Sequence, residues 1–360
     1  MDVAIIGAAG ACGRQLAMQL LDRTVIPHDN HLQLVGHRGG MSETELWGLR
    51  ADLRDAFADW SPEIDIALEP DDVDADIVVM LAGATIPTDP NDTSKSITRA
   101  DLGRTNAEIF RTYAEALQAR PSTPIVIVQS NPVELGVDVF ARYLGKHSTL
   151  GAAGWSDTMR WRGEIADDLG IPRRAVQAFV IGEHGDHLVP AWSMLNVRGV
   201  PYEDVLAYEA AQRAGRSLAD LPDEIREGKA RLLELIRAGK IEQAYEYVQA
   251  QPSDLRMGIK PFFVNFTAGR TTEAVTARAV ADLTEDFIAG RRTGVTAQVR
   301  LDGQWHGVHG TVAAPVILGP HGWIEAVDMA LRPDEQEALL AAAESVAATI
   351  TESLTGPGDT

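Results

Sequence analysis

Short apolar runs alternate with amphipathic stretches through the first 150 residues. Helical periodicity follows several of these runs, at 14–21, 99–117 and 133–144. Short apolar runs between helices are typical of parallel strands that are buried on both faces. The pattern therefore predicts an α/β domain with a doubly wound parallel sheet over residues 1–148. The predicted strands are Val3–Ile6, His31–Val35, 65–68, 75–81 and 124–129.

The pattern changes in the second half of the chain. Residues 202–248 are dense in Glu, Lys, Arg, Ala and Leu with helical periodicity, which predicts two or three exposed amphipathic helices without chemistry. We expect a C-terminal α+β domain over 149–354, with a helical insertion at about 202–260 and a frayed tail at 355–360. Its other predicted elements are helices at 271–289 and 334–354 and strands at 297–301 and 311–318.

Composition narrows the classes of partner. Lys and Arg number 32 and Asp and Glu 52, so the formal net charge is −20. That charge argues against nucleic acid and against an anionic membrane surface. The sole cysteine, Cys12, excludes an internal disulfide. With neither a signal peptide nor a long apolar span apparent, we expect a cytoplasmic protein.

A glycine turn joins the first strand to the first helix, in the spacing Gly-x-x-Gly-x-x-Gly. Glycines let the backbone approach a pyrophosphate, and the N-terminus of a helix offers N–H groups to an anion. The sequence therefore predicts a dinucleotide-binding fold of the Rossmann type. The turn comprises Gly7, Ala9, Gly10, Ala11, Cys12 and Gly13.

The second strand ends at Gly36, His37 and Arg38, where an NAD-binding unit usually places an acid against the ribose. No acid is present. Arg38 or His37 could meet a 2′-phosphate, which favours NADP over NAD. A plain turn with a solvated arginine is the alternative.

Residues suited to acid–base chemistry lie farther along. His184 stands in the turn Gly182-Glu183-His184-Gly185-Asp186, and an imidazole is a natural general acid and base near neutral pH. Ordinary loop chemistry would also explain this turn. Asp157 and Arg160 share one face of a predicted helix, either as a local ion pair or as part of a site. Arg99 begins a helix, where a cation opposes the dipole, so a ligand explains it better than stability. Asn131 follows a strand and could bond a ligand.

Taken in order, these pieces resemble the lactate and malate dehydrogenase family over most of the chain, and the glycine turn is closest to that of the malate dehydrogenase branch. The matching motifs are the glycine turn, Ala82-Gly83, Arg99-Ala100-Asp101-Leu102 with Asn106, Asn131-Pro132-Val133, Asp157-Thr158-Met159-Arg160-Trp161-Arg162, the His184 turn and Ala314-Pro315-Val316-Ile317-Leu318-Gly319.

The resemblance implies hydride transfer between NAD(P) and C2 of a 2-hydroxy or 2-oxo acid. His184 would exchange the proton with the substrate oxygen, and Asp157 would orient the imidazole. Arg160 would grip the substrate carboxylate, Arg99 would polarise the carbonyl from a closing loop, and Asn131 would bond the substrate oxygen. The implied cofactor-binding residues are those of the glycine turn together with Gly36, His37, Arg38, Ala82, Gly83, Asn106 and Asn131. A homodimer or homotetramer without a metal is also implied.

The chain departs from the family at the loop 84–98, which is longer by about seven residues by simple alignment. Thr93 stands, by simple count, where malate-specific members carry an arginine, although Lys95 could substitute. A substrate other than malate, with a polar far end, is therefore expected. Thr271 matches the region that lines the pocket opposite that loop.

Two other functions remain open at this point. One is a glycosidase of the related family that uses a nicotinamide cofactor with a divalent metal. That family uses a cysteine as a metal ligand, whereas Cys12 lies in the glycine turn. His306 and His309 could suggest metal, but a surface hairpin explains them better. The other is a catalytically silent NAD(P)-binding protein, which would have no need of His184, Asp157 and the two arginines together.

Overall fold

The first half of the chain forms a parallel sheet with helices between its strands, as the apolar runs predict. A computed structural model describes residues 1–85, 99–268 and 272–355, with only the backbone described at 99–101. The sheet order is β3-β2-β1-β4-β5-β6, with every pairing parallel. The order reverses between β1 and β4, and in such sheets ligands bind beyond the carboxyl ends of the strands. The strands are β1 Val3–Ile6, β2 His31–Val35, β3 Glu63–Ala67, β4 Ile77–Met80, β5 Ile125–Val128 and β6 Thr149–Gly151.

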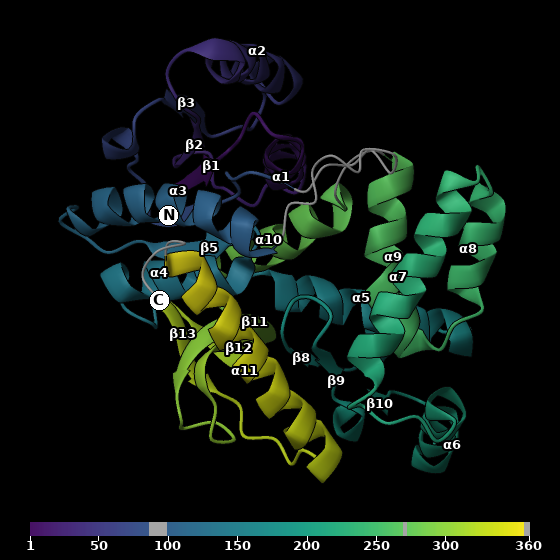
Figure 1. The fold of residues 1–360 in the computed structure, drawn as a ribbon. Coiled ribbons are helices and arrows are strands. Elements are labelled where there is room, and N and C mark those ends of the chain that lie inside the picture. Colours follow the sequence, from purple (N-terminus) through teal and green to yellow (C-terminus); the bar gives the residue numbers. More distant parts are fainter. Residues whose placement is uncertain (86–98, 269–271, 356–360) are drawn as a thin grey trace.

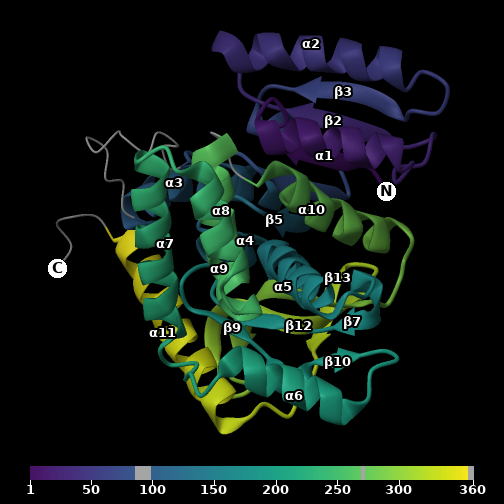
Figure 2. The same ribbon diagram turned by 90° about the vertical axis from the view of Figure 1, so that its right-hand side faces the viewer.

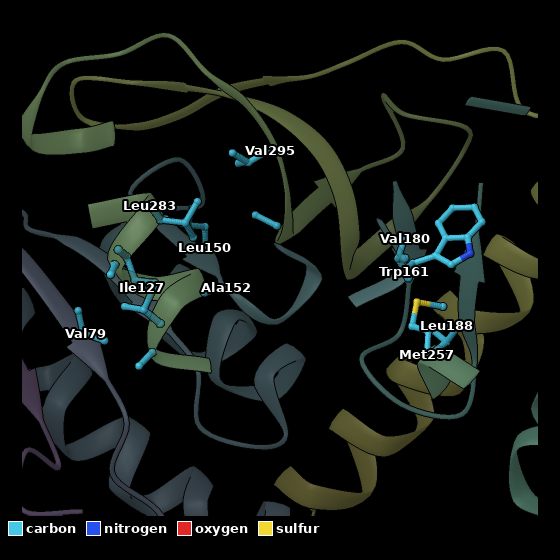
Figure 3. Packing of buried hydrophobic residues seen from close by; sticks show 14 of the residues in the cluster. Val79, Ile127, Leu150, Ala152, Trp161, Val180, Leu188, Met257, Leu283 and Val295 are labelled. Carbon is cyan, nitrogen blue, oxygen red and sulfur yellow. The ribbon is translucent and has the colours of Figure 1, made fainter. Parts of the chain in front are cut away.

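Side-chain alternation along these strands divides the core between the two faces of the sheet. Val3 and Ile5 belong to one buried cluster, and Ala4 and Ile6 to another. Successive strand residues point to opposite faces, so each strand supports both layers of helices. Figure 3 shows Val79, Ile127, Leu150 and Leu283 grouped within the first cluster. The helices of this half are α1 Ala11–Asp22, α2 Gly40–Ala56, α3 Arg99–Gln118 and α4 Val133–Leu144, with a short 3-10 turn at Pro70–Asp72.

The sheet continues into the second half through antiparallel strands. Gln298 in β11 pairs with Gly151 in β6, and the order runs on as β11-β12-β8-β9, with β13 beside β12. The predicted strands at 297–301 and 311–318 lie within β11 and β12, whereas β13 was not predicted. A division at residue 148 remains our prediction. The strands are β8 Val180–Gly182, β9 Leu188–Pro190, β11 Gly294–Asp302, β12 His309–Gly319 and β13 Gly322–Ala326, with β7 Val176–Gln177 paired separately to β10 Asn196–Val197.

The helical region after residue 201 is packed against the rest of the protein. The two or three helices predicted at 202–248 correspond to α6, α7 and α8, and α7, α8 and α9 lie side by side in Figures 1 and 2. Helix α7 is amphipathic as predicted, because it buries Ile225, Leu232 and Ile236 on one face and exposes the other. The helices are α5 Ala153–Leu169, α6 Tyr202–Arg213, α7 Leu221–Arg237, α8 Ile241–Gln249, α9 Ser253–Ala268, α10 Glu273–Ile288 and α11 Pro333–Leu354, with 3-10 turns at Arg173–Ala175 and Trp192–Met194.

Buried ion pairs fix α9 on α5. The guanidinium of Arg256 donates to Glu164 and to Asp168, each at 2.6 Å, and Lys260 donates to Glu164 at 2.5 Å. Helix α9 is therefore a fixed neighbour of α5. Among the described helices, none is long and apolar enough to span a membrane.

Candidate active site

A cavity of about 310 Å³ opens at the carboxyl edge of the parallel strands. It is bounded on one side by the start of α1 and the ends of β4 and β5 and on the other by helices of the second half. This is the position expected for a ligand in a doubly wound sheet. The lining includes Cys12, Gly83, Ser130 and Asn131 from the first half and Asp157, Arg160, His184, Lys229, Met257, Phe262, Thr272 and Thr276 from the second.

Folding brings the predicted acid–base residues together in this cavity. Asp157 Oδ2 lies 2.6 Å from His184 Nδ1, while Asp157 Oδ1 accepts from Arg160 Nη1 at 2.6 Å. Asp157 and Arg160 face the cavity from α5, and His184 follows β8. One carboxylate therefore holds both a histidine and an arginine from two different elements.

The charge on Asp157 is stabilised despite its burial. Its side chain is only 7% exposed. Burial alone would raise the pKa of Asp157, but His184 and Arg160 outweigh burial and lower it. The carboxylate therefore stays ionised beside the imidazole.

Arg160 is held in a fixed orientation at the cavity wall. Its Nη2 donates to Thr272 Oγ1 at 2.8 Å, in addition to the pair with Asp157. Arg160 thus forms the local ion pair and also lines the cavity, and its role toward a substrate stays a prediction. A guanidinium has five N–H donors in a plane, so it can hold these partners and still meet a carboxylate.

The glycine turn forms a tight backbone bend before α1. A Cβ atom on Gly13 would lie 2.4 Å from the carbonyl oxygen of Gly7, and Gly7 itself has a φ of +86°. Gly10 caps α1 without a side-chain hydrogen bond. The first N–H groups of α1 therefore point to a position that an anion can occupy.

Asn106 joins two of the loops at the strand edge. Its Oδ1 accepts from the N–H of Ala84 at 2.7 Å, and its Nδ2 donates to the carbonyl oxygen of Asn131 at 2.6 Å. Gly83 is close as well, since a Cβ there would lie 3.0 Å from the Asn106 amide. Asn106 is fully buried and does not line the cavity. It positions the backbone of the two loops that contain Ala84 and Asn131.

Gly36, His37 and Arg38, at the end of β2, do not line the cavity. A Cβ on Gly36 would meet Leu46 and Ser42, so close packing explains this glycine. Arg38, whose side chain is 64% exposed, donates to Glu69 at 2.9 Å. His37 is exposed. The guanidinium of Arg38 thus already has a carboxylate partner.

Some expected site residues cannot be placed, and others were not expected. Thr93 and Thr271 lie outside the described residues, and of Arg99 only the backbone at the start of α3 is described. The cavity also contains Glu134, Glu183, Lys229 and Phe262, which the sequence analysis did not select. Glu134 and Glu183 carried a signal, since the first directly follows Asn131-Pro132-Val133 and the second stands in the His184 turn. Lys229 brings α7 to the cavity wall, although the sequence analysis expected no chemistry from residues 202–248.

His306 and His309, between β11 and the start of β12, do not form a cluster with other potential metal ligands among the described residues. They lie in the predicted surface hairpin between β11 and β12, where Asp302, Gln304, Gly307 and His309 are exposed, although Trp305 is only 2% exposed. Within the described side chains, no group of three or more His, Cys, Asp or Glu could hold a metal ion.

Comparison with known proteins gives matches in both halves. Residues 1–152 match the family model of the lactate/malate dehydrogenase NAD binding domain, and residues 156–239 match that of the lactate/malate dehydrogenase alpha/beta C-terminal domain. The malate dehydrogenase of Syntrophotalea carbinolica is 30% identical over 270 residues, which are 74% of this chain and 73% of that relative. The L-lactate dehydrogenase of Mesoplasma florum is 27% identical over 278 residues, 77% of this chain and 74% of the relative.

Solved structures share the fold across nearly the whole chain. The lactate dehydrogenase of Cryptosporidium parvum, complexed with lactic acid and nicotinamide adenine dinucleotide, has a TM-score of 0.76 at 23% identity and covers 99% of this chain and 98% of that one. The malate dehydrogenase of Plasmodium falciparum has a TM-score of 0.74 at 21% identity, with 98% of each chain covered. The α/β fold with its Rossmann sheet is thereby confirmed. Together, the two family matches and the relatives show that the chain belongs to the lactate/malate dehydrogenase family of oxidoreductases.

Proposed function

We propose that this oxidoreductase interconverts a 2-hydroxy acid and a 2-oxo acid with NAD(H). The observation that carries the proposal is the contact of Asp157 with both His184 and Arg160, at 2.6 Å each. An acid–base group and a carboxylate-binding group are thus held together at one cavity wall. Family membership supports the same reaction class.

His184 acts as the general acid in reduction and the general base in oxidation. Because Asp157 engages Nδ1, the proton passes through Nε2 to the substrate oxygen. Asp157 keeps the imidazole in one orientation and stabilises its cation. Asn131, which also lines the cavity, supplies a hydrogen bond to the same oxygen.

Arg160 binds the substrate carboxylate through two parallel hydrogen bonds. Its contact with Thr272 sets the plane of the guanidinium, which fixes the direction in which the substrate is presented. The proposal for Arg99 as a polarising group on the loop follows from the family resemblance alone.

The glycine turn fits a dinucleotide, because Gly7 and Gly13 leave no room for side chains and α1 presents its N-terminus there. The coenzyme supplies or accepts the hydride when it is bound. The preference for NADP that the sequence suggested is not supported, since Glu69 engages Arg38 and the matched domain model is one for NAD binding. We therefore propose NAD(H).

We propose that the oxidised substrate is a 2-oxo acid other than oxaloacetate. The reduced substrate is then a 2-hydroxy acid other than malate. The support for this proposal is Thr93, which stands where malate-specific members carry an arginine. Opposite the strand edge the cavity has both apolar and polar groups, namely Met257, Phe262, Asn265 and Lys229. Such a wall suits a side chain with a polar end.

The test follows NADH and NADPH absorbance against 2-oxo acids with varied far ends, in wild type and in His184→Asn. We expect NADH to be oxidised faster than NADPH. The His184→Asn variant should lose about 10²–10⁴-fold in turnover because the proton donor is gone, with NADH affinity retained by fluorescence titration. Unchanged turnover in that variant, or a wild type that reduces no 2-oxo acid, would contradict the proposal.

The metal-dependent glycosidase is not favoured. Both family models describe lactate/malate dehydrogenases, and Cys12 lines the cavity from the glycine turn. The homodimer or homotetramer and the cytoplasmic location stay predictions.

A further inference from the structure

Besides Asp157, a second acidic residue, Glu134, binds the turn that carries His184. The backbone N–H of His184 donates to Glu134 Oε1 at 2.7 Å. Glu134 lies in the first turn of α4, three residues after Asn131, and is only 5% exposed. The loop that carries Asn131 and the turn that carries His184 are therefore joined through one buried carboxyl group.

A buried glutamine extends this link to the catalytic helix. Gln298 in β11, which is fully buried, places its Nε2 3.4 Å from Glu134 Oε1 and accepts the N–H of Gly154 on its Oε1 at 3.0 Å. Gly154 stands in the first turn of α5, three residues before Asp157. The contacts Gly154–Gln298–Glu134–His184 thus connect α5, β11, α4 and the histidine turn.

The charge of Glu134 is coupled to that of the imidazole. The pKa of Glu134 is raised overall, because burial and the neighbouring Glu183 outweigh the lowering effect of His184, so the charge of Glu134 depends on the imidazole beside it. Glu183 belongs to the histidine turn and is itself only 5% exposed. Asp157 contacts the ring of His184 from α5, and Arg160 and Lys229 line the same cavity. The described lining residues Leu102 of α3 and Val346 and Ile350 of α11 carry no charge.

We propose that Glu134 is a positioning residue for His184, an inference that rests on the proposed function. Glu134 fixes the backbone of the histidine turn, and its negative charge favours the protonated imidazole that reduction of a 2-oxo acid requires. In a buried site a nearby opposite charge stabilises an ion more strongly than it does in water.

Two variants separate the hydrogen bond from the charge. Glu134→Gln keeps an oxygen that can accept the N–H of His184 but removes the charge. Glu134→Ala removes both. Asp138→Asn is the matched control, because Asp138 lies one turn farther along α4, is equally buried, and pairs with Arg142 and Arg300 instead of the histidine turn.

The first measurement is the pH dependence of 2-oxo acid reduction. In Glu134→Gln we expect the high-pH decline of kcat/KM to begin at lower pH than in wild type, since the protonated ring is less favoured. In Asp138→Asn the decline should stay in place. A decline that does not move in Glu134→Gln, or that moves equally in the control, would overturn the role of the charge.

The second measurement does not depend on turnover. In protein labelled with ¹⁵N-histidine, the His184 amide is identified by its loss in His184→Asn, and its hydrogen exchange is followed. We expect exchange about tenfold faster or more in Glu134→Ala, because the buried hydrogen bond is lost, and near-wild-type exchange in Glu134→Gln. Unchanged exchange in Glu134→Ala would overturn the positioning role. If the wild type reduces no 2-oxo acid, the proposed function is wrong. The exchange experiment still tests whether Glu134 fixes the backbone of His184.

Discussion

The two walls of the cavity differ in the contacts that hold them in place. The strand-edge wall, at the ends of β4 and β5 and the start of α1, lies above strands whose side chains are all buried. The helical wall, from α7 and α9, presents Lys229, Met257 and Phe262. Apolar burial stabilises both walls, since Ile225 and Ile259 belong to the buried core, and charged pairs between distant segments add to the support of the second.

Each wall has a construction that suits its task. A parallel sheet sets backbone positions to within a narrow range, which a pyrophosphate bound by backbone N–H groups requires. On the helical side, α7 and α9 approach closely where Gly228 meets Ile259 and Gly258 meets Ile225. The buried pairs of Arg256 fix α9 to α5, so side chains of that wall have fixed places opposite His184. We infer that the first wall serves the coenzyme and the second the substrate.

The largest expected effect comes from the helical wall. Arg256→Met leaves the buried Glu164 without its principal partner, so the free energy of unfolding should fall by about 3–5 kcal/mol in urea denaturation. Arg231→Met is the control, since Arg231 pairs with Glu234 on the exposed surface of α7 and should contribute within about 0.5 kcal/mol. Equal losses in the two variants would show that ion pairs do not hold this wall.

A smaller effect is expected at the strand-edge wall. Gly13→Ala places a Cβ against backbone atoms of Gly7 and Ala8, which cannot move away, so we expect a loss of about 1–3 kcal/mol and weaker NADH binding. Gly48→Ala, in the exposed middle of α2 with open space around it, should instead stabilise by about 0.5–1 kcal/mol. Thermal unfolding and fluorescence titration with NADH measure both. Unimpaired NADH binding in Gly13→Ala would count against the assignment of this wall to the coenzyme.

The smallest effect concerns substrate choice. Lys229 donates to Asp186 at 2.5 Å, and its side chain is 26% exposed at the cavity. In Lys229→Met we expect KM for 2-oxo acids with polar far ends to rise about 2–5-fold, with NADH affinity unchanged, because the exposed part of such a contact contributes under about 1 kcal/mol. Lys240→Met, on the exposed connection before α8, is the control. A loss of NADH affinity, or an equal rise for apolar 2-oxo acids, would remove the distinction between the walls.

Local sequence patterns predicted most strands of the Rossmann half and the motifs of the site. Strands β1 and β2 and helix α4 begin and end at the predicted residues, because apolar runs, glycine turns and helical periodicity act through near neighbours. The same local signals selected His184, Asp157 and Arg160. They missed α2 and β6 in the first half and β13 in the second, where β13 pairs with β12.

The sequence by itself determined the fold class, the glycine turn and the acid–base residues, since each is written in a few adjacent positions. Only the tertiary structure decided that Glu134 and Gln298 support His184, that Lys229 reaches the cavity, and that Arg38 is engaged by Glu69. The physical reason is separation along the chain. Glu134 and His184 are 50 residues apart, and Gln298 and Glu134 are 164 apart. A buried polar group needs a partner, but which distant group supplies it is fixed only when the elements pack.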